Sequence, residues 1–170
     1  MPNPFAEYFK KAGLIDDEKY EKLKKQEELE SKKNEYGDFV TIYKDWYYKN
    51  GKINPNLFEQ IAIDIVNLFK NSKLTSTKLR QYYDIVNNLY KEKIYNNEAK
   101  LKSELYLMLA KANYDYGRKQ IVPLSFIQFI RYNLKEIVFN KDGHTVEEKF
   151  KLFKKHFEAI VAYSKWVLKE

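Results

Sequence analysis

Apolar residues recur along this chain at intervals of three and four positions, the spacing of one face of an α-helix. No stretch alternates apolar and polar residues for long enough to predict a strand. Glycine and proline, which interrupt helices, number only five and four. The pattern therefore predicts an all-α protein. We expect residues 37–170 to form a single compact helical-bundle domain of about five to six helices, and residues 1–36 to form a charged N-terminal helical extension.

The first two helices of the bundle are predicted over residues 54–71 and 75–91. Asn54 followed by Pro55 is a start signal, because the asparagine caps free N–H groups and proline suits the first turn. In the second of these helices, the expected buried stripe is Leu79, Tyr82, Tyr83, Val86, Leu89 and Tyr90. Arg80 lies on the opposite face and is predicted to point into solvent.

The helix predicted over residues 97–116 is apolar on two sides. One seam is Leu101, Leu105, Met108, Ala112 and Tyr116, and the other is Leu107, Ala110 and Tyr114. A helix with two apolar sides is expected at the centre of a bundle. Gly117 should end this helix in the left-handed conformation, which places Arg118 and Lys119 beyond its C-terminus. Positive charge is favoured there by the helix dipole, so helix capping and phosphate contact both remain open for this pair.

Two further helices are predicted after Pro123 and after Thr145. The first should bury Leu124, Ile127, Ile130, Leu134, Ile137 and Val138. Arg131 stands on its flank. The last helix keeps bundle spacing through Val146, Phe150, Phe153, Phe157, Ile160, Ser164 and Val167. Its aromatic residues are interpreted as core and not as a surface for base stacking, and His156 is expected at the rim.

The first fifty residues differ in composition. Lys and Glu dominate residues 16–35, which predicts a solvated helix held weakly to the rest. Residues 38–49 are expected to form a short packed helix that leads to an Asn50-Gly51 turn. The residues that should pack in this short helix are Phe39, Ile42, Tyr43 and Trp46.

The net charge of +7 is concentrated in one part of the chain. Residues 73–142 contain 13 Lys and Arg against seven Asp and Glu, a net charge of +6. This excess predicts a polyanionic partner, because Lys and Arg that neutralise phosphates release counterions. Only three of the 31 basic residues are arginines, whose planar guanidinium groups suit phosphate. They are Arg80, Arg118 and Arg131, and a surface ion pair is the structural alternative for each.

A membrane surface is the competing polyanion. The sequence shows no signal peptide, lipidation motif or apolar run of 18 residues, so we expect a cytoplasmic protein with no membrane partner. The absence of cysteine agrees with a reducing compartment.

Residue patterns for catalysis are sparse. His144 and His156 are the two histidines, and neither has a carboxylate pair nearby in the sequence at metal-ligand spacing. No phosphate-binding glycine loop, nucleophile motif or His-Glu helix motif is present. We therefore expect a binding protein and not an enzyme, with no catalytic residue, no cofactor and no metal site.

Three segments together resemble a known family. LTSTKLR at residues 74–80 opens one helix, YDYGRK at residues 114–119 closes the next long helix, and FKKHFEAIVAYSKWV covers residues 153–167. In this order and with this helix spacing, they resemble the small all-helical subunit of type III-A, Csm-type, CRISPR effector complexes. The resemblance extends over about residues 55–170.

The resemblance implies a non-catalytic subunit of an RNA-guided antiviral ribonucleoprotein. In that family, copies stack side by side along a filament, opposite backbone subunits that hold the CRISPR RNA, and nuclease activity belongs to other subunits. A basic face runs along the target RNA paired to the CRISPR RNA. The implied partners are both RNAs, the backbone and large nuclease subunits, and further copies of this chain. The residues expected to contact RNA are Arg80, Arg118, Arg131, Lys73, Lys78 and Lys119.

Two other functions are compatible with the composition. A helical adaptor could bind a protein partner and no RNA, with its positive charge serving solubility. A helix-turn-helix DNA reader could use residues 55–95, although the outward Asp and Asn side chains of residues 76–95 suit a major groove poorly. Steep salt dependence would distinguish RNA binding from an apolar contact.

Overall fold

The computed structural model describes residues 4–44, 47–139 and 141–170, and most of these residues are helical. Two-residue strands and two 3-10 turns, η1 and η2, lie between the α-helices. In chain order the elements are α1 (Pro4–Lys11), α2 (Asp17–Tyr36), α3 (Phe39–Ile42), β1 (Tyr48–Lys49), β2 (Lys52–Ile53), η1 (Pro55–Phe58), α4 (Gln60–Phe69), α5 (Ser76–Lys91), η2 (Ile94–Asn96), α6 (Glu98–Gly117), α7 (Leu124–Val138) and α8 (Val146–Val167). The all-α prediction is confirmed.

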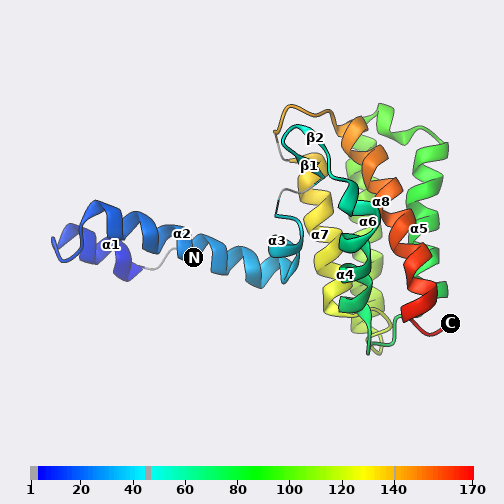
Figure 1. The fold of residues 1–170 in the computed structure, drawn as a ribbon, viewed down its shortest axis with the longest axis horizontal. Helices are drawn as coiled ribbons and strands as arrows, with labels where there is room; N and C mark the ends of the chain where they lie inside the picture. The colour runs from blue at the N-terminus through cyan, green and yellow to red at the C-terminus, as the bar shows by residue number, and fades with distance from the viewer. Residues whose placement is uncertain (1–3, 45–46, 140) are drawn as a thin grey trace.

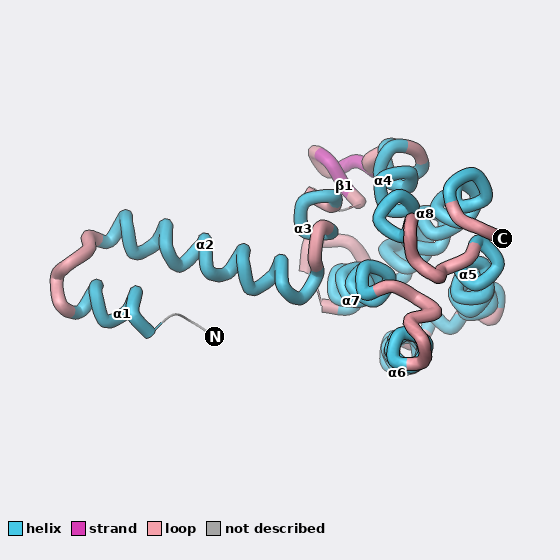
Figure 2. The backbone as a smooth tube through the Cα atoms, turned by 90° about the horizontal axis from the view of Figure 1, so that it is seen from below, coloured by secondary structure: helices cyan, strands magenta, loops and turns pink. Residues whose placement is uncertain are grey.

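Helix α8 lies at the centre of the bundle, between α4 and α5 (Figures 1 and 2). Helix α7 also contacts α8, and α6 packs mainly against α7. The predicted seam of α8 is largely buried because it faces these neighbours: Phe150, Phe153, Phe157, Ile160 and Ser164 are at most 1% exposed. A central α8 explains why its apolar spacing persists along almost its whole length.

The central position predicted for α6 is wrong. Its first seam is buried from Leu101 to Ala112, but Leu107 and Tyr114 on its second seam are each 63% exposed. In Figure 2 α6 lies at the edge of the bundle, beyond α7. Two smaller errors have a related cause: Tyr90 and Leu124, predicted to be buried, are 36% and 48% exposed, because neighbouring elements cover them only in part.

Residues 38–49 do not form the single helix predicted for them. Helix α3 ends after one turn at Ile42, and Tyr48–Lys49 pairs antiparallel with Lys52–Ile53. The predicted Asn50-Gly51 turn is confirmed. Both of its residues have positive φ, +53° and +73°, as the tight turn of a two-residue hairpin requires. Trp46, expected to pack in this region, lies outside the described residues.

A polar network occupies the core beside α3 and corrects the placement of His156, which is fully buried and not at the rim. Its Nδ1 is 2.7 Å from the carbonyl oxygen of Leu57, which can only accept, so Nδ1 carries the proton. Its Nε2 then accepts from the Tyr43 hydroxyl at 2.6 Å. Asn133 on α7 bonds the hydroxyls of Tyr43 and Tyr47. The network thus joins α8 and α7 to the segment that contains Tyr43, Tyr47 and Leu57.

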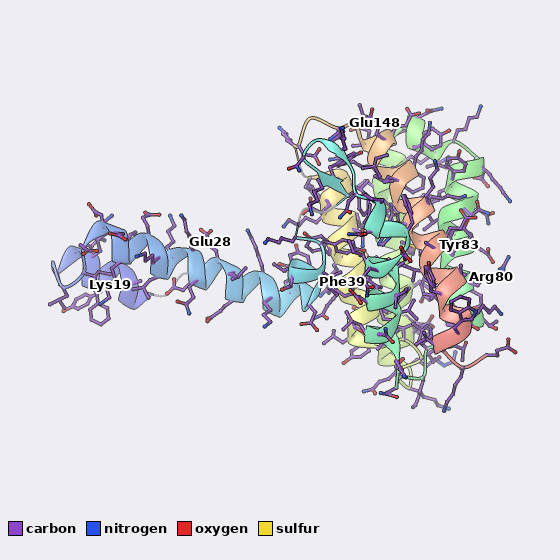
Figure 3. The ribbon with its side chains drawn as sticks, viewed as in Figure 1. Lys19, Glu28, Phe39, Arg80, Tyr83 and Glu148 are labelled. Atoms are coloured by element: carbon purple, nitrogen blue, oxygen red, sulfur yellow. The ribbon has the colours of Figure 1, made fainter. Side chains whose placement is uncertain are left out.

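Helices α1 and α2 form a hairpin that extends to one side of the bundle (Figure 1). Helix α2 reaches the bundle at its C-terminal end, where it contacts α3 and α7. Gly37 ends it with φ +58° and ψ −138°, a conformation that other residues rarely adopt. A Cβ atom there would lie 2.4 Å from Oε1 of Gln128 on α7. The fully buried Phe39 lies two residues after Gly37, and Figure 3 shows it where α2 meets the bundle.

Candidate nucleic-acid interface

Two of the three motifs, LTSTKLR and YDYGRK, meet through Asp115. The charge pattern of the sequence did not single out this residue. The structure places its carboxylate on α6 opposite the first turns of α5, where Oδ2 is 2.9 Å from Nζ of Lys78. The Tyr82 hydroxyl donates to the same oxygen at 2.6 Å, and Nζ of Lys111 lies 3.4 Å away. Asp115 is 5% exposed, so this cluster ties LTSTKLR to YDYGRK in the tertiary structure.

The charges around Asp115 keep it ionised. Burial by itself would raise the pKa of its carboxyl group, but hydrogen bonds from Tyr82 and Lys78, with the positive charges of Lys111 and Lys78, outweigh burial and lower it. The carboxylate in turn balances positive charge on the two lysines. Lys78 therefore has a structural bond, and less of its charge is available to an external phosphate.

Lys73 and Lys119 lie side by side at the end of the bundle where the contact between Lys78 and Asp115 is found. Nζ of Lys73, in the link between α4 and α5, donates to the backbone carbonyl of Lys119 at 2.9 Å. A carbonyl fixes the position of an ammonium group without cancelling its charge. Both side chains are exposed. Lys73 therefore presents its positive charge to solvent from a held position, and the exposed Lys119 adds a second positive charge beside it.

Arg118 directly follows α6, as predicted, but Gly117 does not supply the left-handed turn. Gly117 stays within the helix, and Lys119 and Gln120 take the positive φ angles of +62° and +53°. The backbone closes through the N–H of Gln120 to the carbonyl of Tyr116 and that of Ile121 to Asp115, both at 3.0 Å. The backbone N–H of Arg118 bonds Tyr114, and its side chain is exposed.

Four of the six predicted residues thus gather at one end of the bundle, which we name the basic end: Lys73, Lys78, Arg118 and Lys119. The other two lie elsewhere. Arg80 is exposed on α5 at the outer edge of the bundle (Figure 3). Arg131 borders a hollow of about 250 Å³ between α6 and α7, near Tyr36 at the end of α2. Arg80 is two residues from Lys78 but on another side of α5, and Arg131 lies on α7. The sequence could not show this division, because it depends on how α5, α6 and α7 pack.

No helix among the described residues is long and apolar enough to cross a membrane. Within the same residues, no group of three or more His, Asp or Glu side chains is arranged to hold a metal ion. The site that the motifs build is a cationic surface with one buried carboxylate.

Comparison with known proteins gives one result. A family model described as Csm2 Type III-A matches residues 52–170, which include the hairpin's second strand and all of the bundle from η1 onward. No curated protein and no solved structure matches the chain. Both motifs that meet at Asp115 fall inside the matched residues.

Proposed function

The chain belongs to the Csm2 family of type III-A CRISPR systems and is a small subunit of a type III-A effector complex, and from this premise we propose that its basic end binds the backbone of the target RNA. The observation that carries the proposal is the gathering of Lys73, Lys119 and Arg118 at one end of the bundle, with Lys73 fixed by a carbonyl. Lys78 stands beside them on α5 and shares its charge with Asp115.

The proposed mechanism is independent of RNA sequence. Ammonium and guanidinium groups neutralise phosphates and release counterions, while pairing between CRISPR RNA and target RNA supplies specificity. The subunit has no catalytic role in this proposal. Of the six predicted residues, Arg118, Lys119 and Lys73 contribute most, because an acid partly balances Lys78 and the arginines Arg80 and Arg131 lie on other faces.

We further propose that copies of this subunit stack in the complex through the exposed apolar residues of α6. Leu107 and Tyr114 are each 63% exposed on one face of that helix, and Tyr106 beside them is 42% exposed. Apolar surface of this kind is a common feature of subunit contacts. The same stripe is the observation that favours the alternative function, an adaptor that binds protein and no RNA. Helices α1 and α2 form an extension outside the matched family region, and we propose that the complex acts in the cytoplasm.

The decisive experiment reverses one charge at the basic end in the reconstituted complex. Arg118→Glu should weaken target-RNA retention and reduce the slope of log K against log salt by about 1, since one phosphate contact is lost. Arg80→Glu is the matched control, because it makes the same charge change on another face. Retention is measured at several salt concentrations, and thermal unfolding is recorded for both variants.

Three results would count against the proposal. Equal loss of RNA in the two variants would show a general charge effect and no particular role for the basic end. A large loss of thermal stability in Arg118→Glu would assign Arg118 to capping α6 through the helix dipole. Retention that does not depend on salt would favour the adaptor.

A further inference from the structure

A second hollow lies at the other end of the bundle, where the β1–β2 hairpin faces the N-terminal half of α8. Its volume is about 380 Å³. The hairpin contributes Tyr48 and Ile53, which are paired across the two strands, and the loop before α8 contributes His144. From α8 come Glu148, Lys151, Leu152 and Lys155, whose spacing of three and four places them on one helix face. None of these residues belongs to the basic end.

We infer that this hollow binds one unpaired nucleotide of single-stranded RNA, with the base on the rings of Tyr48 and His144 and the phosphate at Lys155. The inference adds a site to the proposed function and does not require the basic end to bind RNA. Helix α8 spans about 30 Å between the two ends, given its 22 residues. The chain would therefore contact paired RNA at one end and an unpaired nucleotide at the other.

The two rings already form a stack. Their centroids are 3.6 Å apart and their planes differ by 4°, which is the separation and orientation of stacked bases. The His144 side chain remains 28% exposed, and Tyr48 is half-buried, so part of the ring surface stays accessible. Leu152 and Ile53 add apolar contacts beside the rings. Any base can stack on such a surface, because every base has a π-face.

Lys155 is the basic side chain at the hollow that we expect to meet a phosphate, on the side away from the Glu148 and Asp142 carboxylates that act on Tyr48. Nζ of Lys151 is 2.6 Å from Oε1 of Glu147, so that ammonium group is already balanced. The Glu148 carboxylate lies on the border, but it accepts from the backbone N–H of Thr145 at 2.9 Å and caps α8. Lys155 is exposed one turn beyond Lys151. The acid three residues after it, Glu158, bonds Lys154 at 2.9 Å.

The size and composition of the hollow indicate an unpaired nucleotide and not a duplex. A volume of about 380 Å³ falls within the range of about 300–1,000 Å³ for small-ligand sites. In a duplex the faces of the bases are covered by their neighbours, whereas an unpaired strand can turn a base out onto aromatic rings. The combination of stacked rings, apolar side chains and one exposed ammonium group matches the base and phosphate of one nucleotide.

The two histidines of the chain provide a direct test. His144 lies in the hollow, whereas His156 is fully buried in the core and serves as an internal reference. The full-length protein is titrated with 5′-AMP and, separately, with an unpaired RNA octamer, and the histidine ring signals are followed by NMR. Saturable shifts of His144 with constant His156 signals support the site. A response to the octamer alone still supports it and indicates an RNA strand over a free nucleotide.

Charge-reversal variants complete the test. Lys155→Glu should raise the Kd obtained from the His144 shifts about tenfold. This is the change expected for loss of one charge-assisted contact. Lys25→Glu, on the exposed surface of α2, is the matched control and should change nothing. Arg118→Glu should leave the AMP response intact, so failure at the basic end and failure at the hollow are distinguishable. No shift of His144 with either ligand, or equal binding by Lys155→Glu and wild type, would overturn the inference.

Discussion

The buried His156 predicts that this protein loses stability in mild acid well before its carboxylates are protonated. The imidazole is enclosed by α8, α7 and the segment containing Tyr43, and its two nitrogens bond Leu57 and Tyr43. Burial lowers its pKa from 6.5 to about 4, and this outweighs the opposing effect of the hydrogen bond to the Leu57 carbonyl. The unfolded chain therefore takes up a proton at this residue between pH 6.5 and 4, and the folded chain does not.

The size of the effect follows from this pKa difference. A pKa change of one unit corresponds to about 1.4 kcal/mol, so full protonation of the unfolded state removes about 3 kcal/mol. The loss begins as the pH falls through 6.5 and is complete near pH 4. At pH 5 it amounts to about 2 kcal/mol, which corresponds to a decrease in Tm of about 4–8 °C for a domain of this size.

Urea unfolding at pH 7 and pH 5 provides the assay, with wild type compared with His156→Gln. The variant cannot titrate in this range, so its free energy of unfolding should change about 2 kcal/mol less between the two pH values than that of wild type. Low-pKa carboxyl groups such as Asp115 titrate in both proteins and cancel in this comparison. Equal pH dependence of His156→Gln and wild type would refute the reasoning.

Two substitutions test other parts of the structure. Gly37→Ala should destabilise the junction of α2 with α7 by about 1–3 kcal/mol, because φ +58° with ψ −138° is a conformation almost confined to glycine, whereas the end of the Gln128 side chain that its Cβ would meet can move aside. Hydrogen exchange at the end of α2 reports this change, and no loss of protection there would contradict the conformational argument. Gly13→Ala, at a positive φ with open space around it, should cost about 1 kcal/mol. Asp115→Asn should lower the free energy of unfolding by about 1–3 kcal/mol yet strengthen RNA binding at low salt, because the lysines around it lose their counterion. Urea unfolding and RNA titration check this pair of effects, and unchanged RNA binding would mean that these lysines do not face RNA.

Much of the fold was predictable from local pattern. Helix boundaries followed from caps and turns: the side chain of Thr75 accepts from the N–H of Lys78, and Thr145 forms a capping box with Glu148. The largely buried stripes of α5 and α8 followed from apolar spacing. The three motifs also indicated the family correctly, because their order and spacing lie in the sequence itself.

The candidate site was predictable only in part. The sequence indicated which basic residues accompany the motifs, but Lys73 and Lys119 are 46 positions apart and meet only in the folded chain. The balancing role of Asp115 was missed, since its partner Lys78 lies on another helix. The hollow beside Tyr48 was missed as well, because its rings come from residues almost a hundred positions apart.

The sequence by itself determined which residues form helices and which helix faces are apolar, since both depend on neighbours within a few positions. The tertiary structure decided which of those faces are covered. Spacing alone placed α6 at the centre, yet Leu107 and Tyr114 face solvent because no described element lies over them. His156 became a core residue because Leu57 and Tyr43, 99 and 113 positions away, enclose it. Burial depends on such distant partners, and local periodicity contains no information about them.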